Sequence, residues 1–252
     1  MNVVLQEKLK AALIHLAVCG VIAALVLCLV FFAWYPGLLS RLQGVGTILL
    51  IVLIADVTIG PLLTLVVYKR GKKSLKMDLA IIALIQLVFL AYGLYTIEIA
   101  RPAYLIFVKD RLEVVSRSDW PKGEALKASP SAAPKWFSPK LIAAKGPEDS
   151  KEKLALILDS AAGGPDIHHL PKYYVEYKDQ LALVSSKLLP LAKLEELNIG
   201  REKEIFSAIA GLNISQEKLG FLPLRARQGD AAALVLRSSG EIVDIWPFAP
   251  WK

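Results

Sequence analysis

Cysteine is almost absent from this sequence of 252 residues. The two cysteines, Cys19 and Cys28, lie in one apolar stretch near the N-terminus, and none follows position 28. Because they are nine residues apart on one predicted helix, they cannot bond to each other. The sequence is therefore not a disulfide scaffold, and the cysteine count does not decide between a reducing and an oxidising compartment.

Charged residues are scarce in the first 100 positions, which hold eight Lys or Arg and four Asp or Glu. The chain has a net charge of +7, a mean hydropathy of +0.48 and 55% hydrophobic residues. These values exclude a disordered chain and an ordinary soluble globule. Residues 101–252 have the charge content of a water-soluble domain, which excludes a transporter that lies in the membrane along its whole length.

Motifs that mark common enzymes are missing as well: the sequence has no G-x-S-x-G, G-x-x-x-x-G-K-[ST], H-E-x-x-H or C-x-x-C. His168, His169 and Asp166 are the best candidates for a metal site. Adjacent histidine side chains diverge in most backbones, however, and no further ligand has zinc-like spacing. We therefore expect no metal, no cofactor and no catalytic residue, and a protein that is not an enzyme.

Three long apolar runs fill the N-terminal part, at residues 11–40, 42–68 and 79–97. The first and third contain no Asp, Glu, Lys or Arg, and the second contains only Asp56. A helix of about 20 apolar residues crosses the hydrocarbon core of a bilayer. The sequence predicts a membrane domain of residues 1–100 with spans at about 13–35, 46–68 and 78–98.

The first apolar run could also belong to a cleaved signal peptide, because Lys8 and Lys10 precede it. Its length exceeds the roughly 7–15 residues of a signal-peptide core. Residues 34–37, Trp-Tyr-Pro-Gly, indicate an interfacial aromatic belt and a helix end rather than a cleavage site. We expect an uncleaved anchor.

The loops predict the orientation in the membrane. Five of the eight residues 69–76 are Lys or Arg, whereas the connection between the first two spans has only Arg41. The positive-inside rule places the N-terminus and the basic loop in the cytoplasm, and residues 101–252 outside. Binding of anionic lipid head groups by this loop is compatible with that role. The large domain lacks a basic and aromatic array, so we expect no nucleic-acid partner.

Polar residues inside the predicted spans are few. Asp56, Gly60 and Thr64 follow one another at four-residue spacing and share one small, polar helix face, while Gln86 lies at similar depth in the third span. Two interpretations stay open: a structural Asp56–Gln86 hydrogen bond, or a contact of all four residues with a partner's transmembrane helix. An ion pathway is disfavoured because one carboxylate in three spans makes a poor conduit. His15 is interpreted as ordinary interfacial polarity.

From position 101 the pattern becomes that of a soluble domain. Aromatic and β-branched residues predict strands at 104–108, 112–115, 221–227, 232–236 and 241–245. Helical spacing predicts helices between them, from 148 to about 162 and at 173–189, 191–197 and 202–210. The predicted fold class is α+β: three N-terminal transmembrane helices, then an α+β domain over 101–252 with an antiparallel sheet.

Two segments of the predicted domain have no regular pattern. Residues 116–147 contain five prolines and predict a long irregular loop, of the kind that is often functional. The C-terminal Trp-Pro-Phe-Ala-Pro-Trp at 246–251 has three possible roles: packing on the sheet, docking at the membrane surface or holding a partner.

Several strings in the first 110 residues carry a family resemblance. They are Phe-Ala-Trp-Tyr-Pro-Gly at 32–37, Asp-Val-Thr-Ile-Gly-Pro-Leu-Leu-Thr at 56–64, Lys-Lys-Ser-Leu-Lys-Met-Asp-Leu at 72–79, Ala-Tyr-Gly at 91–93 and Arg-Pro-Ala at 101–103. In this order and spacing they resemble the type IV pilin accessory proteins of the TfpX/TfpZ group of Gram-negative bacteria.

The resemblance implies an inner-membrane protein that assists assembly or surface display of a specific type IV major pilin, in a chaperone-like manner. It implies that pilin, membrane lipid and the pilus assembly machinery as partners, and no catalytic residue is carried over. Partner specificity is expected in the domain outside the membrane, above all in residues 116–147. The alternative function is a periplasmic enzyme or cofactor that acts on pilin modification. A membrane sensor fits less well, because the predicted cytoplasmic parts are too short for a signalling domain.

Overall fold

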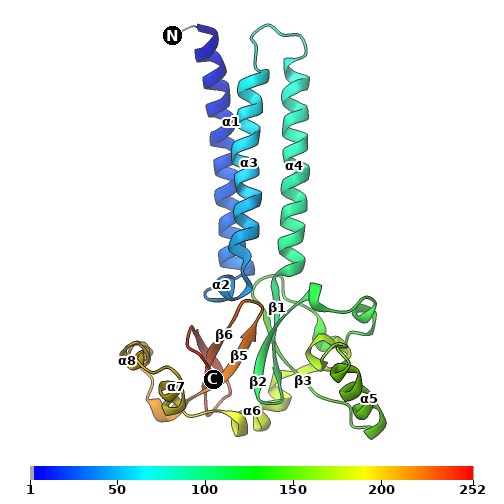
Figure 1. Ribbon diagram of the computed structural model, residues 1–252, viewed down its shortest axis with the longest axis vertical. Helices are drawn as coiled ribbons and strands as arrows, with labels where there is room; N and C mark the ends of the chain where they lie inside the picture. Colours follow the sequence, from blue (N-terminus) through cyan, green and yellow to red (C-terminus); the bar gives the residue numbers. More distant parts are fainter. Residues whose placement is uncertain (1–2, 252) are drawn as a thin grey trace. The chain divides into compact units, whose positions relative to one another are not determined.

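The computed structural model describes residues 3–251, which form two units (Figure 1). The helical unit comprises the described residues up to Ser40 together with Gly44–Ile99. The C-terminal unit comprises Arg41–Gln43 and the residues from Ala100 onward. Each unit has its own buried apolar cluster and is described by itself.

Three long helices make up the helical unit: α1 (Val3–Cys28), which continues as the π-helical segment η1 (Leu29–Trp34), α3 (Val45–Val67) and α4 (Leu75–Ala100). All three are long and apolar enough to cross a membrane, so the three predicted apolar helices are confirmed as candidate spans. The first helix begins ten residues earlier than predicted. The short helix α2 (Leu39–Gln43) follows the Pro36-Gly37 turn, which ends the first span as expected.

The buried cluster of the helical unit lies where η1 ends. The Tyr35 amide donates to the Val30 carbonyl at 2.8 Å, which closes the wider π turn. The Tyr35 hydroxyl donates to the Ile97 carbonyl of α4 at 3.0 Å. Val45 and Leu49 of α3 pack against the same residues. One aromatic side chain therefore joins the first and third spans at this end of the unit.

The C-terminal unit is built on a seven-stranded sheet with the order β4-β3-β1-β2-β5-β6-β7. The strands are β1 (Pro102–Val108), β2 (Arg111–Ser116), β3 (Lys140–Ala144), β4 (Tyr174–Glu176), β5 (Leu219–Ala226), β6 (Gly229–Leu236) and β7 (Ile242–Trp246). All five predicted strands are present among them. The α+β class is therefore confirmed.

The prediction of an antiparallel sheet is wrong for two of the six strand pairs. β3 runs parallel to β1, with Tyr104 opposite Lys140, and β5 runs parallel to β2, with Leu112 opposite Leu224. Parallel neighbours need long connections, because the chain must return to the same end of the sheet before it pairs. The segment 116–139 provides that return before β3, and the helical segment between β4 and β5 provides it before β5.

The prediction of a helix over 173–189 is wrong in its first half. Residues 174–176 form β4, then the 3₁₀ turn η7 (Tyr177–Gln180) leads into α6 (Leu181–Lys187). The Tyr174 ring packs edge-on against Tyr104 and Trp120, and its hydroxyl donates to the His168 carbonyl at 2.6 Å. Tertiary packing of this aromatic ring overrides the helical spacing of the sequence.

The other helices occur where they are predicted: α5 (Ser150–Ala161), α7 (Leu191–Leu197) and α8 (Glu202–Gly211). Short 3₁₀ turns complete the unit: η2 (Arg117–Asp119), η3 (Glu124–Lys127), η4 (Pro130–Ala132), η5 (Ile167–His169), η6 (Pro171–Tyr173) and η8 (Gln216–Lys218). Trp246 and Phe248 of the C-terminal tail are buried in one core with α7, α8, β5 and β6. Of the three roles considered for the tail, packing in the domain is therefore the one observed for these two rings.

Residues 116–147 are more ordered than the predicted loop. They contain η2, η3, η4 and the strand β3. The Tyr104 hydroxyl donates to the Ala132 carbonyl at 2.5 Å, and the buried Arg101 guanidinium donates to the Lys135 carbonyl at 2.8 Å. Two side chains from the start of the domain thus hold this segment in place through its backbone.

Candidate functional site

The polar residues of the predicted spans meet inside the helical unit. The Gln86 side chain of α4 donates from Nε2 to the Asp56 carbonyl at 2.9 Å and to Asp56 Oδ1 at 3.2 Å, both on α3. The same nitrogen lies 3.6 Å from Cys19 Sγ on α1. Asp56 is only 8% exposed. The structural Asp56–Gln86 hydrogen bond that the sequence predicts is present, and it joins α3 to α4.

Gly60 makes room for this contact. A Cβ atom at position 60 would lie 2.1 Å from Gln86 Nε2, far inside van der Waals contact. Gly60 is one turn from Asp56 on the same helix face, so the Gln86 amide lies flat on the backbone of α3. Small residues at such positions let helices approach closely in a bilayer. The glycine therefore belongs to the same intramolecular contact as the carboxylate.

A second polar contact lies one further turn along the same face. His15 Nδ1 of α1 lies 2.6 Å from Thr64 Oγ1 of α3, and Thr64 is buried. The interpretation of His15 as ordinary interfacial polarity is incomplete, because its ring contacts another helix. Its spacing to Cys19, four residues further on α1, was the available signal for an inward-facing pair.

The structure thus brings together Asp56, Gly60 and Gln86, and places Thr64 beside them on the same helix face. In one of the two interpretations left open by the sequence, all four contact a partner's transmembrane helix. In this structure the Gln86 nitrogen, the Asp56 carboxyl, the Thr64 hydroxyl and the space above Gly60 are used within the chain. A partner helix would have to replace these contacts, and the partner-binding role of the four residues stays a prediction.

Basic residues gather where the start of α1 meets the α3–α4 loop, here called the basic end. The Lys8 ammonium donates to the Val66 carbonyl at 3.2 Å, Arg70 is paired with Glu7, and Lys72 lies 2.6 Å from Asp78. The N-terminal lysines and the basic loop therefore lie at one end of the helical unit, as the predicted topology requires.

The two adjacent histidines of the C-terminal unit do not diverge as expected. The ring centroids of His168 and His169 are 4.1 Å apart. Burial lowers the pKa of both imidazoles. Repulsion from His169, Arg111 and Arg225 lowers the pKa of His168 further, and attraction by Asp166 opposes this. The pKa of His168 is lowered to about 4. Residues 3–251 contain no cluster of three or more His, Cys, Asp or Glu side chains that could hold a metal ion.

The nearest cavity to these histidines has a volume of about 560 Å³ and lies between α5 and the β1–β2 turn. Lys109, Lys153, Ser160 and Asp166 are its polar lining residues, and neither His168 nor His169 lines it. The Ser160 hydroxyl donates to Asp166, and this hydrogen bond lowers the pKa of the Asp166 carboxyl. An enzymatic role centred on the histidines would need them in such a pocket.

Helix α5 differs from α6, α7 and α8 because it has no buried residue. Leu154, Ile157 and Leu158 occupy one side of it at helical spacing and are each more than half exposed. We call these three residues the α5 face. Leu126, Trp136 and Phe137, in the segment predicted to determine specificity, are also large apolar residues that are more than half exposed. Clusters of this kind mark interaction sites more often than scattered single residues do.

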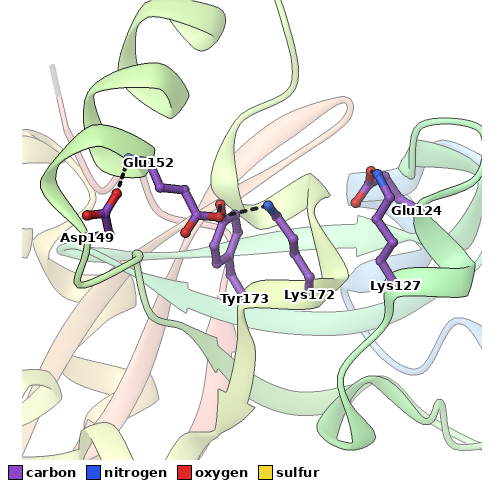
Figure 2. Close-up of polar contacts among 6 residues, drawn as sticks. All are labelled: Glu124, Lys127, Asp149, Glu152, Lys172 and Tyr173. Carbon is purple, nitrogen blue, oxygen red and sulfur yellow. Dashed lines mark hydrogen bonds and ion pairs between the residues drawn. The ribbon is translucent and has the colours of Figure 1, made fainter.

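Polar contacts hold α5 in place (Figure 2). Glu152 Oε1 accepts a hydrogen bond from the Tyr173 hydroxyl at 2.7 Å and one from Lys172 Nζ at 3.0 Å. These two donors lower the pKa of the Glu152 carboxyl. Asp149 caps the helix by accepting from the Glu152 amide at 2.9 Å. The helix is therefore attached through its first turn and through the Ser160–Asp166 hydrogen bond in its last turn, and the α5 face stays exposed.

Together these features define a class of protein: a chain with three potential membrane spans, polar side chains that contact one another between these spans, and a folded α+β domain that exposes an apolar helix face. A family profile described as "Fimbrial assembly protein FimB" matches residues 4–37. The fimbrial assembly protein of serogroup I from Dichelobacter nodosus is 30% identical over 219 residues, which is 85% of each chain. The chain therefore belongs to the fimbrial assembly protein family.

Two further relatives from Dichelobacter nodosus agree with this assignment. The fimbrial assembly protein of serogroup E1 is 29% identical over 219 residues, again 85% of each chain. That of serogroups C1 and C2 is 34% identical over 112 residues, which is 44% of this chain and 86% of the relative. No solved structure matches the chain. The comparisons support the broad part of the family resemblance, namely fimbrial assembly, and do not reach the narrower pilin accessory group.

Proposed function

We propose that this protein is an inner-membrane accessory protein that binds a type IV major pilin and assists its assembly or surface display. In this proposal the N-terminus and the basic end of the helical unit lie in the cytoplasm, and the C-terminal unit lies in the periplasm. The protein acts by binding, in a chaperone-like manner, and not by catalysis. The excess of Lys and Arg at the basic end supports this orientation.

The relatives support the pilus part of the proposal. All three are named as fimbrial assembly proteins, and each name carries a serogroup label. These names support a role in fimbrial assembly, and the match to one type of pilin is part of the proposal.

The observation that carries the proposal is the α5 face. Three large aliphatic side chains stand uncovered on a helix that buries nothing in its own domain. Leaving such side chains in water is unfavourable by about 25 cal/mol for each Å² of apolar surface, so covering them favours association. The α5 face and the exposed residues Leu126, Trp136 and Phe137 are the proposed contact.

In-cell photo-crosslinking tests this assignment. A crosslinking amino acid is placed at Ile157 of the α5 face, at Trp136, and at Phe206 of α8 as a matched exposed aromatic control. A fourth probe at Leu63 reports the bilayer-facing side of α3, because Thr64 itself is buried. Capture of the major pilin at Ile157 and Trp136 but not at Phe206 is expected. Capture of assembly-machine subunits alone would contradict a direct action on pilin.

The alternative enzymatic function has its own test at the histidine pair. His168→Gln and His169→Gln remove the imidazoles while the protein level is followed by immunoblotting. The binding role predicts normal numbers of surface pili in both variants. Loss of pili with a normal protein level would favour an enzyme that modifies pilin, and would count against the proposal made here.

A further inference from the structure

A cavity of about 660 Å³ lies at the basic end of the helical unit, between α1, α3 and α4. Its apolar lining includes Ala11, Ile14 and Val18 of α1 and Leu79 and Ala83 of α4. Its volume is in the range of typical small-molecule sites. We propose that this cavity binds one anionic phospholipid, with an acyl chain along these apolar residues and the head group at Lys10.

The depth of the cavity matches one leaflet of a bilayer. Its lining on α1 runs from Glu7 to Val18, which at 1.5 Å per residue is about 17 Å along the helix axis. Half of the hydrocarbon core of a bilayer is about 15 Å thick. A phospholipid chain lies in one leaflet, whereas a partner's transmembrane helix extends through both. The dimensions therefore favour a lipid.

The lining of the cavity ends next to the polar contact described above. Gln86 of α4 touches Asp56 of α3 and Cys19 of α1, so all three helices meet at this level. Cys19 follows Val18 directly, and Gln86 is three residues beyond Ala83. An occupant that lies within the cavity therefore ends at this level, whereas a helix of about 20 residues would extend beyond it.

The charge at the open end determines the type of head group. Lys10 lines the cavity, is exposed, and has no carboxylate partner among residues 3–251. Arg70, which also lines it, is neutralised by Glu7. The basic end as a whole carries seven Lys or Arg against Glu7 and Asp78. An anionic phosphate group at Lys10 would be attracted by this excess of positive charge, since basic pockets between transmembrane helices bind such head groups.

Native mass spectrometry of the full-length protein tests this inference. The detergent-purified, delipidated protein is titrated with phosphatidylglycerol or phosphatidylcholine that have the same acyl chains. One phosphatidylglycerol adduct per chain is expected, at least about fivefold tighter than the phosphatidylcholine adduct, since one Lys near a membrane surface contributes about that factor. Equal affinity for the two lipids would overturn the proposed head-group contact.

Two matched pairs of variants locate the site. Ala83→Trp fills the cavity and should abolish the adduct, while Ala80→Trp, on an exposed position of α4 outside the lining, should leave it unchanged. Lys10→Gln should remove the preference for phosphatidylglycerol, whereas Lys76→Gln makes the same charge change away from the cavity and should retain it. An adduct that persists in Ala83→Trp would overturn the proposal.

The other occupant to be tested is a helix of another protein. A photo-crosslinker placed at Ala83 in cells distinguishes a bound lipid from a bound helix. Crosslinks to lipid alone are expected. A crosslinked protein at Ala83 would show that a helix enters the cavity and would overturn the lipid assignment. The inference does not depend on the proposed pilin contact, which is tested at different positions in the C-terminal unit.

Discussion

The two units of this protein differ in the residues that they expose. In the helical unit Asp56, Thr64 and the Gln86 amide face inward, while Phe32 and Phe89 are 82% and 68% exposed. In the C-terminal unit the apolar residues are buried and most ion pairs lie on the surface. Each pattern suits its solvent, hydrocarbon for the helices and water for the domain. The α5 face departs from this pattern, since three large apolar side chains stand exposed on one helix of a unit that buries most such residues.

The largest predicted effect tests burial in the C-terminal unit. Phe221 of β5 is fully buried, so Phe221→Ala leaves a cavity and should lower the free energy of unfolding by about 3–5 kcal/mol. Phe206→Ala on α8 is the matched control, because that ring is mostly exposed. Four of the five tryptophans lie in this unit, so tryptophan fluorescence follows its unfolding in the detergent-solubilised chain. Equal effects of the two substitutions would contradict the core described here.

The second largest effect is expected for the polar pair Asp56 and Gln86, which lies inside the helical unit. Gln86→Leu removes the donor to Asp56 and leaves a buried carboxyl without its partner, which should destabilise the helical unit by about 1–3 kcal/mol. The double variant Asp56→Leu with Gln86→Leu removes both polar groups and should recover most of this loss. The stability of the single and the double variant is measured by thermal unfolding in detergent, with protease resistance of the three long helices as the readout. A double variant that is less stable than either single variant would contradict the pairing.

Asp56→Asn separates the hydrogen bond from the charge. The asparagine side chain keeps an oxygen that can accept from Gln86, so stability should change by less than about 1 kcal/mol. Pilus numbers in cells that carry this variant then report the carboxylate alone. Normal pili would show that the charge at position 56 is not required, whereas loss of pili with normal stability would support a direct contact with a partner helix.

Acid should destabilise the C-terminal unit through His168. Its pKa is about 4 in the folded protein, against about 6.5 in an unfolded chain, so the unfolded state binds more protons between these values. The stabilising contribution is complete above pH 6.5 and is lost as the pH falls towards 4. From pH 7 to pH 5 the expected loss is roughly 1–2 kcal/mol.

His168→Gln should reduce this pH dependence, as measured by fluorescence-detected denaturation at pH 5, 6 and 7, while His169, whose pKa is also lowered by burial, retains a part of it. The carboxyl of Asp166 has a lowered pKa, so its own contribution is lost only below its ordinary range and does not affect this window. An unchanged slope in the variant would show that other groups account for the acid sensitivity.

What the sequence could predict differs between the two units. In the spans, the scarcity of polar residues made each one informative, so the Asp56–Gln86 contact followed from helical depth alone. The contact of His15 with Thr64 was missed because the sequence fixes depth along a helix but not which neighbour a side chain meets. The spacing of apolar residues indicates whether a segment is a helix or a strand, but says little about how a helix is rotated towards its neighbours.

In the C-terminal unit the sequence predicted the strands of hairpins and missed those that pair over a distance. β1 with β2 and β5 with β6 are local pairs with turn residues between them. β3 lies in a proline-rich stretch and β4 at the start of an apparent helix, and both depend on partners far away in the chain. Tyr174 illustrates the reason, since its aromatic contacts and not its local pattern place it in a strand.

The smallest predicted effect on stability is at the α5 face, where the functional effect should be largest. Leu154, Ile157 and Leu158 touch little of their own unit, so Ile157→Ser and Leu158→Ser should change the free energy of unfolding by no more than about 0.5 kcal/mol. If these residues contact pilin, the same variants should reduce sheared surface pilin several-fold at a normal protein level. Glu152→Gln, which weakens the attachment of α5 without touching its apolar face, is the comparison that separates helix position from apolar contact. Normal pili in Ile157→Ser and Leu158→Ser would mean that the exposed apolar residues of α5 are tolerated without a partner. The α5 face would then have no role in binding pilin.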